Sequence, residues 1–150
     1  MEPTHKGRAI VLPAKFEGSN EMSHCTIKFL GTAETMEGCQ DQVMQALYNL
    51  TCAFGRSPRI FWPTGTDWFG VDRDVPVMRL TDGWLGQLHK LSNRLLDDEG
   101  VVPQPSTWEY QPHVTLADDD MPLPEKITLY PPVLWWEDER PVSVPWMHNV

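Results

Sequence analysis

Two stretches of the chain decide its fold, HCTIKFLG at residues 24–31 and YQPHVTLA at residues 110–117. Both contain a histidine and a threonine two residues apart, each followed by an apolar residue. Successive side chains of a β-strand point to opposite faces, so His24 and Thr26 would share one face while Cys25 and Ile27 pack on the other. Two such strands side by side would gather two imidazoles and two hydroxyls in one cleft.

The apolar residues make the repeat more specific than a bare histidine and threonine spacing. The residue after the histidine and the residue after the threonine must both be apolar as well. The other histidines, His5, His89 and His148, lack this context. A structural alternative exists for each motif residue, since strand histidines often bond to backbone and threonine favours pleated surfaces. The shared phase of all four residues favours a catalytic role. They are His24, Thr26, His113 and Thr115.

Both stretches resemble the paired signatures of the 2H phosphoesterase superfamily, particularly its LigT-like cyclic phosphodiesterases. The resemblance implies an α+β, bilobal fold with two antiparallel sheets, flanking helices and a central cleft that carries both H-x-T motifs. It also implies a hydrolase that cleaves phosphodiester bonds. One histidine would serve as base and the other as acid, because imidazole titrates near neutrality. The two threonines would bind phosphoryl oxygens.

Hydrophobic patterning places these motifs among other elements. Apolar residues at three- and four-residue steps predict helices from Met36 to Phe54 and from Gly83 to Glu99, each followed by a glycine. Strands are expected at 8–12, 23–30, 58–63, 75–80, 110–116, 126–130 and 133–136, with a loop at 64–74. Seven strands and two helices are consistent with an α+β domain.

Composition narrows the class of protein. The 150 residues, 41% of them apolar, predict one domain over residues 1–150. A net charge of −9 argues against a protein that grips long DNA or RNA. Cys25, Cys39 and Cys52 lack metal-binding spacing and are expected to be reduced core thiols. With no signal peptide or membrane span evident, we expect a cytoplasmic protein, in the host cytoplasm if the gene is phage-encoded, without a membrane partner.

Substrate contacts are expected from residues around the motifs. Lys28 would alternate onto the His24 face, and aromatic side chains could stack on bases, whereas Trp62, Trp84 and Trp136 lie in element patterns that predict burial. The substrate-binding candidates are Lys28, Trp68, Phe69, Tyr110 and Trp146. The arginines that could also meet phosphate are Arg56, Arg59, Arg73 and Arg79.

No metal or other cofactor is expected. Two histidines with hydroxyl partners fall short of a zinc or two-metal site. Asp118, Asp119 and Asp120 follow the second motif and could bind Mg²⁺, but such a run of acids is more typical of a solvated turn.

Three functions are compatible with these residues. The acidity and the aromatic side chains favour a phosphodiesterase that cleaves a cyclic nucleotide or cyclic oligonucleotide messenger, similar to the phage anti-CBASS 2H enzymes. The alternative is a LigT-like 2′,3′-cyclic phosphodiesterase acting on RNA ends. A non-catalytic cyclic-nucleotide-binding protein is a third possibility, although loss of a motif residue would then be expected.

Overall fold

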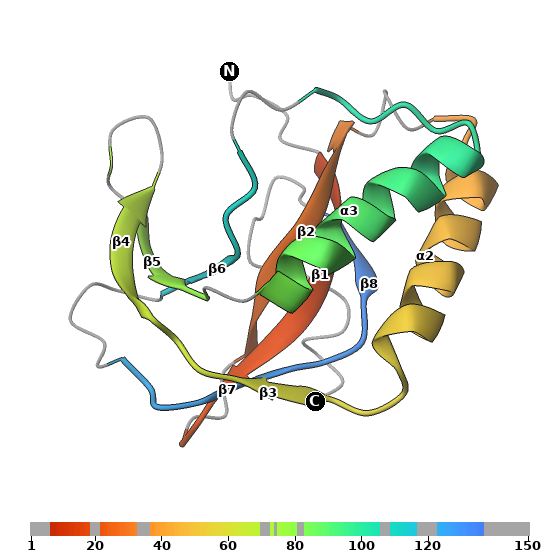
Figure 1. Ribbon diagram of the computed structural model, residues 1–150. Helices are drawn as coiled ribbons and strands as arrows, with labels where there is room; N and C mark the ends of the chain where they lie inside the picture. Colours follow the sequence, from red (N-terminus) through yellow and green to blue (C-terminus); the bar gives the residue numbers. More distant parts are fainter. Residues whose placement is uncertain are drawn as a thin grey trace.

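A computed structural model gives the fold and describes residues 7–18, 22–32, 37–69, 73, 75–80, 83–105, 109–116 and 123–136. These ranges contain two helices and eight strands (Figure 1). In chain order the elements are β1 (Gly7–Phe16), β2 (Met22–Thr32), α2 (Gln40–Phe54), β3 (Arg59–Phe61), β4 (Gly65–Phe69), β5 (Val75–Arg79), α3 (Gly83–Asp98), β6 (His113–Thr115), β7 (Ile127–Leu129) and β8 (Val133–Trp136).

All the strand pairs in these ranges are antiparallel, and their order is β3-β7-β1-β2-β6-β5-β4, with β8 also pairing with β1. The family resemblance implied two sheets, whereas the described strands form one eight-stranded sheet. Within it, the β4-β5-β6 strands join the others through a single Cα pair between β2 and β6, Cys25 with Val114. This narrow junction lies where the two H-x-T motifs meet.

The helices cover one face of the β1-β2 region and lie against each other (Figure 1). The core is formed there by the apolar stripes of α2 and α3 and by alternate residues of β1, Ile10, Leu12, Ala14 and Phe16. Both helices end as predicted, before Gly55 and Gly100, which take positive φ angles of 105° and 77°. The other face of β1 and β2 is therefore left for the site.

Some sequence predictions about single elements are wrong. Residues 65–69 form strand β4 rather than a loop. Trp62 was expected to be buried but is 62% exposed, because it follows β3 at the sheet edge. Trp84 is partly buried against the core as expected. Cys25 is buried, whereas Cys52 is exposed and is not a core thiol.

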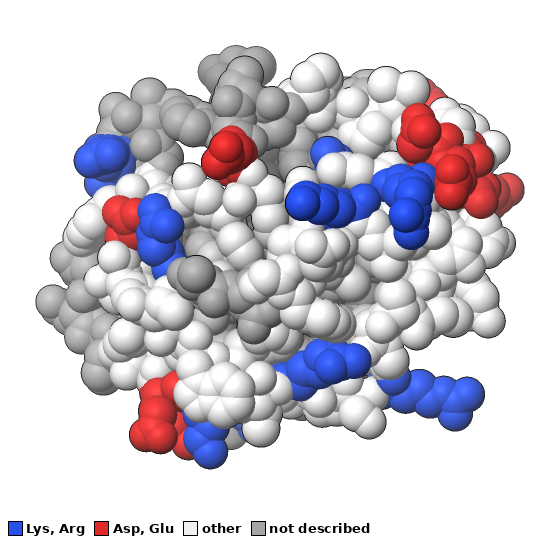
Figure 2. All heavy atoms as spheres, in the orientation of Figure 1, with Lys and Arg blue, Asp and Glu red and all other residues white. Residues whose placement is uncertain are grey.

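The acidic side chains are unevenly distributed. Because the helices run antiparallel, the start of α2 lies near the end of α3, and Figure 2 shows acidic groups gathered there at the upper right. Exposed carboxylates at these two helix ends include Glu37, Asp41, Asp97 and Asp98. Strand β6, with the second motif, lies toward the other side of the same view (Figure 1). No helix within the described residues is long and apolar enough to cross a membrane.

Candidate active site

The site begins at the junction of strands β2 and β6. Cys25 and Val114 are paired there, and both side chains are fully buried in the core. Because side chains alternate along each strand, their neighbours in sequence lie on the opposite face of the sheet from the core. Those neighbours are His24, Thr26, His113 and Thr115.

The antiparallel register fixes how these four residues are arranged. Extending the Cys25 to Val114 pair by one residue in each direction sets His24 beside Thr115, and Thr26 beside His113. Each histidine thus has the other motif's threonine as its neighbour, and the two imidazoles lie on a diagonal. The Ser23 hydroxyl donates to the Thr115 carbonyl at 3.3 Å, which adds a contact between the strands.

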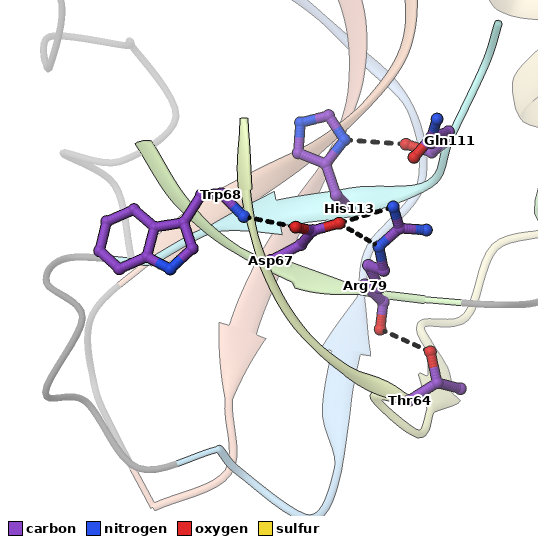
Figure 3. A network of polar contacts seen from close by, with 6 residues as sticks. All are labelled: Thr64, Asp67, Trp68, Arg79, Gln111 and His113. Atoms are coloured by element: carbon purple, nitrogen blue, oxygen red, sulfur yellow. Dashed lines mark hydrogen bonds and ion pairs between the residues drawn. The ribbon is translucent and has the colours of Figure 1, made fainter. Parts of the chain in front are cut away.

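His113 is oriented by the backbone just before it. Its Nδ1 donates to the Gln111 carbonyl at 2.8 Å (Figure 3), so Nε2 remains as the nitrogen that can react. The Phe69 ring lies edge-on at 4.6 Å between centroids. Burial lowers the pKa of His113; the Gln111 carbonyl opposes this shift, and the Arg79 charge adds to it.

His24 lies in a more apolar environment. The ring of Trp135, from strand β8, is 4.6 Å away between centroids. Burial lowers the pKa of His24 to about 4, and the charge of His113 contributes further. His24 is therefore neutral near pH 7 and able to accept a proton. The sequence analysis missed Trp135, because its contact with His24 joins residues more than a hundred positions apart.

Arg79 is the arginine that the structure brings to the motifs. It pairs with His113 across β5 and β6, and its Nη2 lies 2.6 Å from the Asp67 carboxylate. Trp68 N–H donates to the other Asp67 oxygen at 2.8 Å (Figure 3). These hydrogen bonds and the Arg79 charge lower the pKa of Asp67. Arg59, by contrast, donates to the Phe54 carbonyl and lies over Trp84, in a structural role.

Of the three aromatic substrate-binding candidates on β4 and near the C-terminus, the structure brings one to the motifs. Phe69 lies against His113. Trp68, its neighbour on β4, points to the opposite face and is 43% exposed, so it does not line the motif face as predicted (Figure 3). Trp146, like Asp118, Asp119 and Asp120, lies outside the described residues.

Lys28 does not follow the predicted alternation. The register between β1 and β2 shifts between Ile10, opposite Lys28, and Val11, opposite Thr26. This bulge gives β2 an extra residue, and Lys28 becomes the partner of Ile10, whose side chain lies in the core cluster. Burial lowers the pKa of His89 on α3, and the Lys28 charge lowers it further. We therefore place Lys28 on the helix side of the sheet, away from His24.

Tyr110 braces the first motif instead of facing substrate. Its hydroxyl donates to the Thr26 carbonyl at 3.0 Å, while His89 Nδ1 donates to the Ile27 carbonyl at 2.7 Å. The two rings stack at 4.1 Å with an interplanar angle of 2°. Two successive carbonyls at the bulge are thus held by one stacked pair, which ties β2 to α3 and to the segment before β6.

Together these features define an α+β fold in which two antiparallel strands present paired histidines and threonines. No family model matches the sequence, and no curated protein sequence matches it significantly. Solved structures do match. Escherichia coli LigT complexed with 3′-AMP aligns over 87% of this chain and 88% of its own, with a TM-score of 0.52 and 16% identity.

A crystal structure described as a phosphoesterase aligns over the same shares, with a TM-score of 0.53 and 14% identity. LigT complexed with phosphate covers 93% of each chain, with a TM-score of 0.50 and 14% identity. These likenesses confirm the expected LigT-like 2H phosphoesterase fold.

Proposed function

We propose that this protein is a phosphodiesterase of the 2H type that acts on small nucleotides through His24 and His113. The observation that carries the proposal is the Cys25 to Val114 pairing, which sets each histidine beside the threonine of the other motif. A base, an acid and hydrogen-bond donors for phosphoryl oxygens are the groups that cleavage of a P–O bond requires.

The surroundings of the two histidines favour one order of proton transfer. His24, with its pKa lowered to about 4 by burial, is neutral and serves as the base. His113 is proposed as the acid: burial lowers its pKa, but the Gln111 carbonyl that accepts from Nδ1 opposes this shift, and a bound phosphate would further favour the protonated form. On a 2′,3′-cyclic phosphate, His24 takes a proton from water as the water oxygen bonds to phosphorus. His113 protonates the ribose oxygen as its bond to phosphorus breaks.

The threonines supply the remaining chemistry. Charge on the non-bridging oxygens grows in the transition state, and donors already in position stabilise it without reorganisation. Thr26 and Thr115 share the face of the histidines and are the donors proposed here. This set of groups needs no metal ion, so activity should survive chelation by EDTA.

A 2′,3′-cyclic nucleotide has the strongest support as substrate, because the fold matches LigT, which was crystallised with 3′-AMP and with phosphate. The cyclic oligonucleotide messenger of an anti-CBASS enzyme has less support. Of the aromatic side chains on which it rests, Phe69 lies against His113, Trp68 points to the opposite face, and Trp146 lies outside the described residues. It remains a substrate to test.

Chromatography of reaction products tests the proposal directly. Purified protein in EDTA would be incubated with 2′,3′-cAMP, an RNA ending in a 2′,3′-cyclic phosphate, and cyclic di- and trinucleotides. We expect 2′,3′-cAMP to be converted to a monophosphate. Absence of any cleavage across the panel, or cleavage only after Mg²⁺ or Mn²⁺ is added, would contradict the proposed mechanism.

A further inference from the structure

Arg79 has no task in the proton transfers above, yet its strand position brings it next to His113. We infer that the Arg79 guanidinium, held by Asp67, binds a second phosphate of the substrate beside the one that reacts. This inference rests on the proposed function and predicts that, among the nucleotides the site accepts, those with a second phosphate bind more tightly.

Strand order places Arg79 beside the two motifs, one strand further toward the β4 edge of the sheet. The two motifs occupy β2 and β6, and β5 is the next strand beyond β6. Arg79 is the Cα partner of His113, one strand spacing further out, which is about 4.8 Å. It lies on the same face as His113, because paired residues of neighbouring strands share a face. An anion bound there would lie beside the reacting phosphate.

The guanidinium is fixed by contacts that leave donors available. Nε and Nη2 of Arg79 reach one oxygen of Asp67 at 2.8 and 2.6 Å, and Trp68 N–H holds the other oxygen at 2.8 Å. Arg79 has five N–H donors in a planar fork, so the Asp67 contacts occupy only part of it. Its side chain is 40% exposed, and a ligand can reach it.

The surroundings of Arg79 combine charged and aromatic groups. Hydrogen bonds from Trp68 N–H and from Arg79 lower the pKa of the Asp67 carboxyl, and the charges of Arg79 and Arg73 lower it further. Arg79 therefore lies in a cluster of charged groups, within a chain of net charge −9. The Phe69 ring contacts both functional groups: it lies edge-on to His113, and the Arg79 guanidinium carbon is 5.7 Å from its centroid.

Calorimetric binding of two nucleotides that cannot be cleaved at a diester would test this inference. The ligands are 3′-AMP, with one phosphate, and adenosine 3′,5′-bisphosphate, with two. We expect the wild-type protein to bind the bisphosphate roughly tenfold more tightly, as one charge-assisted contact provides. Arg79→Gln should reduce this advantage to about twofold or less. Lys90→Gln, a matched loss of an exposed cation on α3, should leave it unchanged.

Asp67→Ala provides a second variant that keeps the arginine charge but removes the side chain that holds it, and we expect it to lose part of the advantage. Equal weakening of both ligands by Arg79→Gln would place Arg79 on the reacting phosphate and overturn the inference. So would an unchanged advantage, or a wild-type protein with no preference. Cleavage of 2′,3′-cAMP by the wild-type protein judges the proposed function separately, because it needs only one phosphate.

Discussion

At the scale of single residues, the different surroundings of His24 and His113 give the two imidazoles different proton affinities. His24 packs against Trp135, and its pKa falls to about 4. His113 has a carbonyl partner for Nδ1, which partly offsets the effect of burial. A phosphate bound between them would raise both pKa values. The apolar contact opposes this rise at His24 and so helps to keep it unprotonated with substrate bound, as the proposed base must be.

The lowered pKa of His24 predicts a pH dependence of stability. The unfolded chain takes up a proton near pH 6.5, whereas folded His24 takes it up only near pH 4. The free energy of unfolding is therefore unaffected by His24 above pH 6.5 and falls between pH 6.5 and 4, by roughly 3 kcal/mol. Urea unfolding at several pH values would show this loss. His24→Asn should show a shallower decline, and an identical decline in both proteins would contradict the assignment.

At the scale of elements, the geometry of the site depends on a bulge in β2 and on the pair that holds it. The extra residue near Ile27 turns Lys28 toward the helices. It also exposes two successive carbonyls, which accept hydrogen bonds from Tyr110 and His89. Tyr110 lies three residues before His113, so this brace connects the two motifs directly.

Tyr110→Phe removes the hydroxyl and keeps the ring stacked on His89. The Thr26 carbonyl then loses its partner, and we expect a loss of about 1–2 kcal/mol in the free energy of unfolding. We also expect kcat to fall more than KM changes, because Thr26 and His24 would be less firmly placed. Thermal unfolding and steady-state kinetics would measure both. Ile60→Ala, at a half-exposed position of edge strand β3, is a suitable control, and unchanged kcat in Tyr110→Phe would refute the brace.

At the scale of the whole molecule, regular periodicity made much of the fold predictable. Helix α3 was predictable because the apolar stripe along it and the glycine after its end are local signals, and it begins at Gly83 as expected. The shared face of the two motifs followed from alternation around Cys25 and Val114. Strand β4 escaped notice because Gly65 and Asp67 disfavour strands in isolation, and Asp67 is accommodated by its ion pair with a residue of β5.

Contacts between distant segments could not be predicted. Trp135 reaches His24 from β8, and His89 reaches Ile27 from α3; no local pattern encodes either contact. Lys28 was misplaced because a bulge changes the strand phase without changing the apolar pattern around it. The selection of Arg79 among four arginines likewise depended on the pairing of β5 with β6.

The most direct test of the central claim is the turnover of 2′,3′-cAMP, or of the substrate that the panel identifies, by His113→Ala with and without added imidazole. Removal of a positioned proton donor costs 10²–10⁴-fold in rate. We predict a loss of kcat in that range, with circular dichroism unchanged and partial recovery in millimolar imidazole. Near wild-type turnover in His113→Ala would show that the paired histidines are not the catalytic groups.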